Sequence, residues 1–120
     1  MYKRILIATD GSKTASQAVA IGADVAKNVG AEALLVFVGE PGKGEKVLSD
    51  AAQAVGGKAK TISVQGDPAD KILETAENEN VDLIVVGNKG MTGAKRFLLG
   101  SVPNKVSHHA PCSVMIIRTT

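Results

Sequence analysis

The sequence predicts an α/β protein in which a doubly wound, parallel, five-stranded sheet is flanked by helices. Two observations lead to this fold class. Short apolar runs of strand length alternate with longer segments whose apolar residues recur every three or four positions, and strands that alternate with helices form parallel sheets with right-handed crossovers. The apolar residues are mostly Val, Ile, Leu and Ala, with two Phe, one Tyr and no Trp, as expected for a sheet buried between helices.

The first third of the chain contains two predicted strands and one helix. Residues 5–8 form an apolar run that ends in the polar residues 9–12, as a buried strand followed by a turn does. From Ser12 the apolar positions take helical spacing, and Gly30 stands where a helix would be capped. Residues 33–38 are the second buried strand.

The middle of the chain adds a helix, a weaker strand and a second helix start. A Gly-rich loop covers residues 39–44, and a helix follows over residues 47–55. Residues 61–64 alternate between apolar and polar, which favours a strand near an edge of the sheet. Asp67 is an N-cap residue and Pro68 suits the first helical position, so we expect a helix to begin there.

The last third holds two strands separated by a long connection. Residues 81–87 are the most strand-like run in the chain. The connection over residues 88–100 is longer than structure alone requires. Ser101 is predicted to cap a helix that Pro111 ends, and residues 114–117 form the last strand. With 120 residues, no internal repeat and no linker, residues 1–120 form a single predicted domain.

Composition excludes several classes of function. The single cysteine, Cys112, excludes an internal disulfide and suits a reducing compartment. The apolar run after the N-terminus is too short for a signal peptide or a membrane span. The net charge of +2 comes from dispersed residues rather than a basic face. We therefore expect a cytoplasmic protein with no nucleic-acid partner and no membrane partner.

Two polar, glycine-bearing segments follow the first and fourth predicted strands. Ligands of doubly wound sheets bind beyond the carboxyl ends of the strands, at the point where strand order reverses. If these two strands are neighbours, Ala8, Thr9 and Asp10 meet Gly87 and the residues after it. The sequence therefore predicts a ligand site between them.

The segment after the fourth strand has the character of an anion site. Gly87 and Gly90 allow backbone N–H groups to approach an anion closely, and Gly100 precedes a helix that begins near Ser101. Helix N-termini favour phosphate. Positive charge nearby comes from Lys89, Lys95 and Arg96. The alternative is an ordinary surface loop with glycine turns and solvated lysines.

The spacing Gly87, two residues, Gly90, nine residues, Gly100-Ser101 resembles the ATP-binding motif of the universal stress protein family. The runs around this motif are similar to the family as well; they are residues 84–87, 97–102 and 109–112. The opening strand and its Asp-bearing turn, residues 5–12, also resemble the family. The resemblance covers nearly the whole chain and implies a Rossmann-like, five-stranded fold with an adenine nucleotide in the cleft.

The resemblance also implies roles for individual residues. Ala8, Thr9 and Asp10 would line the adenine and ribose side, and Phe37 or Val38 would offer backbone groups to the adenine edge. The ribose and phosphates would be held by Gly87, Gly90, Gly100, Ser101 and the backbone of Val102. Asp10 would face a bound Mg²⁺ or Mn²⁺; its alternative role is to cap the helix that starts at Ser12.

Two departures from the family pattern bear on the ligand. The connection from Gly39 to Glu45 is shorter than in many relatives, and Pro103 stands where relatives often carry a free amide or hydroxyl. Proline removes one phosphate donor. We therefore expect either a weaker affinity for nucleotides or a preference for AMP or cyclic AMP over ATP. Three functions stay open: an adenine-nucleotide (ATP or AMP) sensor or binding module of the stress response, a slow ATPase, and a nucleotide-free dimeric stress protein.

The last strand predicts a homodimer. Residues 114–118 lie at an edge of the predicted sheet, where unpaired backbone groups can pair with another chain. The family resemblance implies the same pairing, with two last strands meeting antiparallel about a two-fold axis. The alternative is a monomer whose edge is protected by Arg118 and the threonines that follow.

Overall fold

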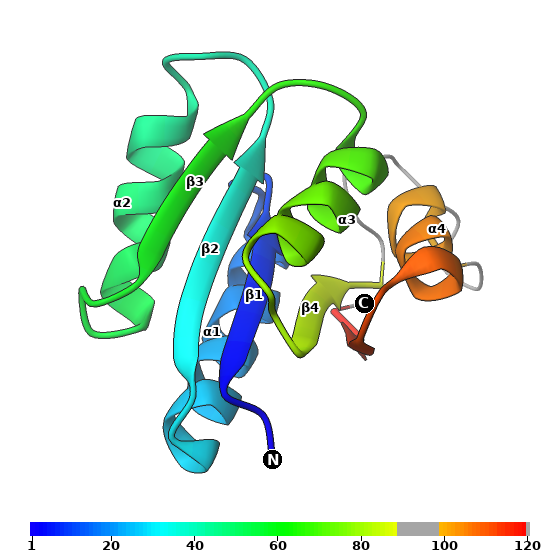
Figure 1. Ribbon diagram of the computed structural model, residues 1–120. Coiled ribbons are helices and arrows are strands. Elements are labelled where there is room, and N and C mark those ends of the chain that lie inside the picture. Colours follow the sequence, from blue (N-terminus) through cyan, green and yellow to red (C-terminus); the bar gives the residue numbers. More distant parts are fainter. Residues whose placement is uncertain (89–98, 120) are drawn as a thin grey trace.

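A computed structural model describes residues 1–88 and 99–119, and within them strands and helices alternate (Figure 1). The elements are β1 (Arg4–Thr9), α1 (Lys13–Val29), β2 (Glu32–Val38), α2 (Gly44–Ala54), β3 (Lys60–Val64), α3 (Pro68–Asn78), β4 (Leu83–Gly87), α4 (Ser101–His109) and β5 (Ser113–Ile117). The predicted fold class is confirmed.

The described strands form one parallel sheet in the order β3-β2-β1-β4-β5. β1 lies at the centre, with β2 on one side and β4 on the other. The chain winds outward from β1 through β2 to β3 and then returns to β4, so strand order reverses between β1 and β4. The expectation that these two strands are neighbours is confirmed, and β3 and β5 are the two edges.

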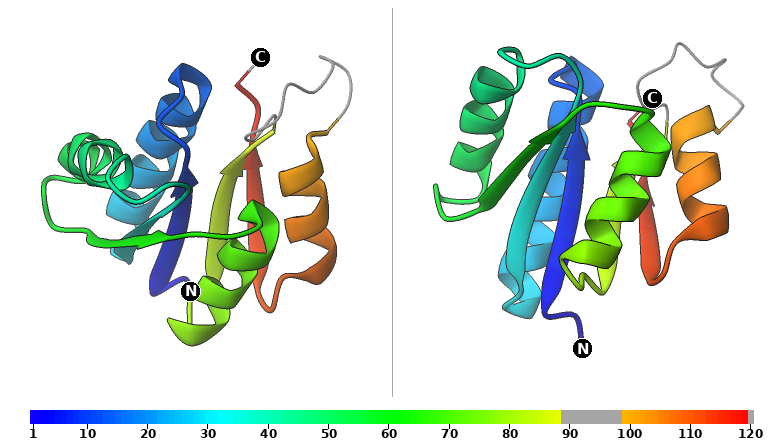
Figure 2. Two further views of the ribbon diagram at one scale, coloured as in Figure 1. Left: turned by 90° about the horizontal axis from the view of Figure 1, so that it is seen from above. Right: turned by 45° about the horizontal axis from the view of Figure 1, so that its top comes forward.

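Helices cover both faces of the sheet. Figure 2 shows α1 and α2 on one side and α3 and α4 on the other. Along β1, Ile5 and Ile7 pack toward α1 and α2, whereas Leu6 and Ala8 pack toward α3 and α4. A central strand covered on both faces has no polar side, which is why this part of the sequence is a continuous apolar run.

Local signals explain the starts of two helices. Ser12 is the N-cap of α1, and its Oγ accepts a hydrogen bond from the N–H of Ala15 at 3.1 Å. Asp67 is the N-cap of α3, where its Oδ2 accepts from the N–H of Asp70 at 3.0 Å, and Pro68 is the first helical residue. These predicted helix starts are confirmed.

Three predicted boundaries are wrong by a few residues. Ser101 is the first residue of α4, and the N-cap position belongs to Gly100, whose extended backbone turns the chain into the helix. α2 starts at Gly44, which the sequence assigned to the preceding loop. β4 starts at Leu83 instead of residue 81, and just before it the carboxylate of Asp82 accepts hydrogen bonds from the backbone N–H groups of Lys3 and Arg4.

No helix in residues 1–88 and 99–119 combines the length and the apolar character needed to cross a bilayer.

Candidate functional site

The carboxyl ends of β1 and β4 meet at one edge of the sheet. Ile7 of β1 is in register with Val85 of β4, so Thr9 and Gly87, two residues further along, end the two strands at the same level. α1 and α4 begin at this edge as well (Figures 1 and 2). The switch point of the sheet is therefore surrounded by two strand ends and two helix starts.

Hydrogen bonds within the turn after β1 set its shape. The Oγ1 of Thr9 accepts from the N–H of Gly11 at 3.1 Å, and the Oδ1 of Asp10 accepts from the N–H of Ser12 at 2.9 Å. Gly11 has φ +82°, and a Cβ there would come within 2.7 Å of the Cγ2 of Val47. Asp10 therefore stabilises the turn. The alternative role predicted for Asp10, capping α1, is wrong, because Ser12 is the N-cap.

Gly100, just before α4, is hydrogen-bonded to Asn88, just after β4. The N–H of Gly100 donates to the carbonyl of Asn88 at 2.9 Å. Gly100 is buried and has an extended backbone, with φ −60° and ψ 157°. The amino end of α4 consequently lies beside the end of β4, where its dipole favours an anion.

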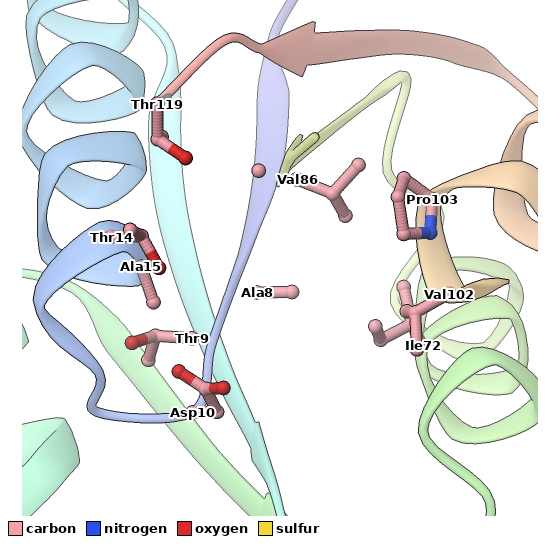
Figure 3. A pocket seen from close by; sticks show the side chains of 11 residues that line it. Ala8, Thr9, Asp10, Thr14, Ala15, Ile72, Val86, Val102, Pro103 and Thr119 are labelled. Carbon is pink, nitrogen blue, oxygen red and sulfur yellow. The ribbon is translucent and has the colours of Figure 1, made fainter. Parts of the chain in front are cut away.

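A cleft opens between these segments (Figure 3). Its lining residues come from both strand ends, both helix starts, α3 and the segment after β5: Ala8, Thr9, Asp10, Thr14, Ala15, Ile72, Val86, Gly87, Val102, Pro103 and Thr119. The oxygen-bearing side chains of Thr9, Asp10, Thr14 and Thr119 lie on one side, and apolar side chains form the other.

The cleft has a volume of about 30 Å³. A space of this size holds water rather than a drug-sized ligand. A larger molecule must therefore lie across the open mouth, where the polar wall and the start of α4 can both reach it.

The apolar wall joins two helices. Ile72 lies on α3, and Val102 and Pro103 lie in the first turn of α4. The Nζ of Lys105 on α4 pairs with the Oδ1 of Asp70 on α3 at 2.7 Å. This ion pair is exposed and contributes little to stability, but it ties the two helices together on the outer side of the wall.

The predicted site residues fall into three groups. Ala8, Thr9, Asp10, Gly87 and Val102 line the cleft. Gly100 and Ser101 precede Val102 at the start of α4. Phe37 and Val38 are buried at the end of β2 and do not line the cleft. The ring of Phe37 lies beneath Gly39 and Gly44, on the α2 side of the sheet. Gly90 lies outside the described residues, as do Lys89, Lys95 and Arg96.

Sequence reasoning missed six lining residues: Thr14, Ala15, Ile72, Val86, Thr119 and the role of Pro103 as part of the wall. For Thr119 a signal existed, because it follows a parallel strand and the carboxyl ends of parallel strands share one edge. The positions on α3 and α4 carried no such signal, since an apolar helix residue facing a cleft resembles one facing the core.

Asp10 is the one charged residue among those lining the cleft. The described residues contain no cluster of three or more His, Cys, Asp or Glu side chains that could hold a metal ion. Within the described part of the chain, an anion at this site would be met by backbone N–H groups and the amino end of α4.

A larger hollow of about 500 Å³ lies between α1 and α2 and shares only Thr9 with the cleft. Its charged side chains are Lys43, Lys46 and Asp50, which are exposed. The segments after β1 and β4 do not converge there, so the cleft is the better candidate site.

Comparison with known proteins identifies relatives of the whole chain. Residues 1–47 and 42–118 match the model of the universal stress protein family. The chain is 34% identical to universal stress protein MJ0531 of Methanocaldococcus jannaschii, over 98% of this chain and 83% of that protein. It is 32% identical to universal stress protein YxiE of Bacillus subtilis, over 98% and 100% respectively. A solved structure, a universal stress protein in complex with cAMP, superimposes with a TM-score of 0.88 at 28% identity, over 99% and 98% of the two chains.

These comparisons also locate a shortened segment. The alignment with the M. jannaschii protein spans 141 positions, more than the 120 residues of this chain, so this chain has gaps in it. The two segments that match the family model overlap at residues 42–47, where the connection after β2 enters α2. Such an overlap indicates that the chain is shorter than the family model at this connection.

Proposed function

Because the chain belongs to the universal stress protein family, we propose that it binds one adenine nucleotide per chain in the cleft between β1 and β4. In this proposal the protein is a nucleotide-dependent binding module of the stress response in the cytoplasm. ATP and AMP are the proposed ligands.

One observation carries the proposal: the segments after β1 and β4 converge at the switch point beside the start of α4. The apolar side chains of Ala8 on β1 and Ile72 on α3 suit the face of an adenine ring. The hydroxyls opposite it suit a ribose. Phosphates would lie toward Gly87 and the start of α4, where backbone groups and the helix dipole favour negative charge.

Cyclic AMP is a second candidate ligand, and two observations favour it. Pro103 is the third residue of α4, so one backbone N–H is missing from the turn that would meet the phosphates. The similar structure with a TM-score of 0.88 is a complex with cAMP. Fewer donors are needed for one phosphate than for three, so the same features favour AMP over ATP.

A divalent cation fits the site only together with a nucleotide. Asp10 is the carboxylate at the cleft, and one of its oxygens already accepts the N–H of Ser12. Mg²⁺ is commonly held by one or two carboxylates plus substrate phosphates. In this proposal Asp10 and the phosphates of ATP hold Mg²⁺ or Mn²⁺, and AMP binds without a metal.

Slow ATP hydrolysis is the alternative to a binding module. Asp10 is the one carboxylate lining the cleft that could activate water. Its Oδ1 is engaged in the turn, which argues against a base poised for catalysis. Phosphate release from ATP by purified protein, compared with Asp10→Asn, distinguishes the two: release that depends on Asp10 would establish the ATPase.

Two experiments test nucleotide binding. Mass spectrometry of the supernatant after denaturation identifies any nucleotide that copurifies with the protein. Calorimetry with ATP, AMP and cyclic AMP should then give one site per chain and Kd values in roughly the micromolar range. No heat above dilution at millimolar concentrations of all three nucleotides would contradict the proposal.

We also propose a homodimer in which β5 of one chain pairs with β5 of another. β5 is an edge strand of the sheet, and Val114, Met115 and Ile116 are only partly buried. An edge with unpaired backbone groups and apolar side chains favours strand pairing.

A further inference from the structure

Four hydrogen bonds between Asn88 and other described residues join three segments of the chain. The backbone N–H of Asn88 donates to the carbonyl of Ile117 at 2.8 Å, and its carbonyl accepts from the N–H of Gly100 at 2.9 Å. Its side-chain Oδ1 accepts from the N–H of Thr119 at 2.9 Å and from the Oγ1 of Thr119 at 3.0 Å. The end of β4, the start of α4 and the segment after β5 are therefore held at one residue.

Thr119 is part of the wall of the cleft. It lies two residues beyond the end of β5, and its side chain faces the space between Thr14 and Pro103 (Figure 3). Its Cγ2 lies 3.9 Å from the position that a Cβ on Gly87 would take. What places Thr119 against the cleft is the pair of hydrogen bonds to Asn88.

The side chain of Asn88 is specific for this contact. Any residue at position 88 can make the two backbone hydrogen bonds, but the two to Thr119 need an acceptor oxygen one methylene from the backbone. Both bonds are partly buried, so water replaces them less effectively than at the surface. Aspartate offers the same acceptor, and alanine offers none.

We propose that Asn88 is a positioning residue of the nucleotide site, and that through it the segment after β5 forms a wall of that site. The inference rests on the proposed function, since it assumes that the nucleotide occupies this cleft. We call the two hydrogen bonds between Asn88 and Thr119 the clamp. Because Thr119 follows β5, the clamp also links the cleft to this edge strand. If the nucleotide binds more tightly when the clamp is formed, bound nucleotide must stabilise the clamp by the same free energy.

The first test needs no nucleotide. Amide hydrogen exchange at Thr119, followed by NMR, reports whether the clamp exists in solution. Asn88→Ala should accelerate exchange at Thr119 by roughly tenfold, as expected from the loss of two partly buried hydrogen bonds. Asn88→Asp should keep the exchange rate near that of the unmodified protein. An unchanged rate in Asn88→Ala would show that the clamp is absent and would overturn the inference.

The second test measures binding of adenosine and of AMP by calorimetry. Asn88→Ala should weaken both by roughly fivefold to tenfold. Asn88→Asp should restore adenosine binding, and its added charge should weaken AMP only. Thr119→Val, which keeps the shape of the wall and loses one hydrogen bond, should have a smaller effect than Asn88→Ala and no further effect when combined with it.

The outcomes separate this inference from the proposed function. Unmodified protein that binds none of ATP, AMP, cyclic AMP and adenosine overturns both. Unmodified protein that binds AMP, with Asn88→Ala binding equally well although exchange at Thr119 is faster, overturns the positioning role alone. A thermal melt of each variant shows whether it is folded. If Asn88→Ala does not fold, Thr119→Val is the deciding variant. Unchanged AMP binding in Thr119→Val would then contradict the inference.

Discussion

Gly87 is the residue at which ligand binding and folding can be tested separately. A Cβ built on it would lie 3.8 Å from the Cβ of Ala18 and 3.9 Å from the Cγ2 of Thr119. These are ordinary contact distances, so the fold has room for a methyl group. The added group would nevertheless lie against Thr119, which lines the cleft where the proposal places the nucleotide.

We therefore expect Gly87→Ala to melt at nearly the same temperature as the unmodified protein and to bind AMP at least about tenfold more weakly. Calorimetry and a thermal melt measure the two quantities. The control is Gly57→Ala, far from the cleft: Gly57 has φ +76°, so this change should cost about 1 kcal/mol of stability and leave AMP affinity unchanged. Full AMP affinity in Gly87→Ala would show that the nucleotide does not approach Gly87.

Pro103 tests the choice among nucleotides. Its side chain is fully buried in the apolar wall, and Pro103→Ala restores a backbone N–H in the first turn of α4. We expect the affinity for ATP to rise relative to that for AMP by roughly fivefold, the effect of about one hydrogen bond to a charged group. Competition binding with both nucleotides gives the ratio. If both affinities change by the same factor, the proline does not select against the longer phosphate chain.

At the scale of elements, two aspartates hold segment ends through backbone N–H groups. The N–H of Asp70 lowers the pKa of Asp67 at the start of α3, and Lys105 adds to this effect. Burial alone would raise the pKa of Asp82, but the hydrogen bonds from Lys3 and Arg4 at the start of β1 outweigh it, and the pKa is lowered. In both cases the folded state favours the charged carboxylate.

The sign of the pH effect follows from these shifts. A carboxylate whose pKa is lower in the folded state stabilises the fold above the ordinary value of 3.8, and that contribution is lost as the pH falls through the folded-state pKa. We expect the free energy of unfolding in urea to fall between pH 5 and roughly pH 3. Asp82→Asn should be less stable than the unmodified protein at pH 7 and should lose less on acidification. An equal loss in both proteins would assign the acid sensitivity to other groups.

At the scale of the whole molecule, the two sheet edges differ in character. β3 has exposed polar residues at three of its five positions, with only Ile62 and Val64 apolar and partly buried, whereas β5 presents Val114, Met115 and Ile116, all partly buried. An edge with apolar side chains is the one expected to be covered by a partner. The proposed dimer therefore forms through β5 rather than β3.

Light scattering should give the mass of a dimer at micromolar concentrations. Ile116→Lys should shift the mass toward the monomer and change AMP affinity far less, because the cleft lies beyond the carboxyl ends of β1 and β4. Retained AMP binding also shows that the variant is folded. Thr61→Lys, on the exposed part of β3, is the matched control and should remain a dimer. A monomer mass for the unmodified protein would contradict the dimer.

The sequence by itself determined the order of strands and helices, the fold class and the starts of α1 and α3. These features depend on local patterns: the buried run at β1, the helical spacing after Ser12, and the Asp67-Pro68 start of α3. Each can be detected within about one turn or strand, because the apolar period and the caps are properties of neighbouring residues. The two segments after β1 and β4 were also identifiable, since parallel strands place their carboxyl ends at one edge.

Only the tertiary structure decided which other side chains meet at that edge. Thr119 comes to the cleft because Asn88, 31 positions earlier, accepts its N–H and hydroxyl. Pro103 and Ile72 form one wall because α3 and α4 pack side by side, while Phe37 turns toward α2. Such contacts depend on how the helices dock on the sheet. That docking is set by packing between residues distant in sequence, for which the local pattern carries no signal.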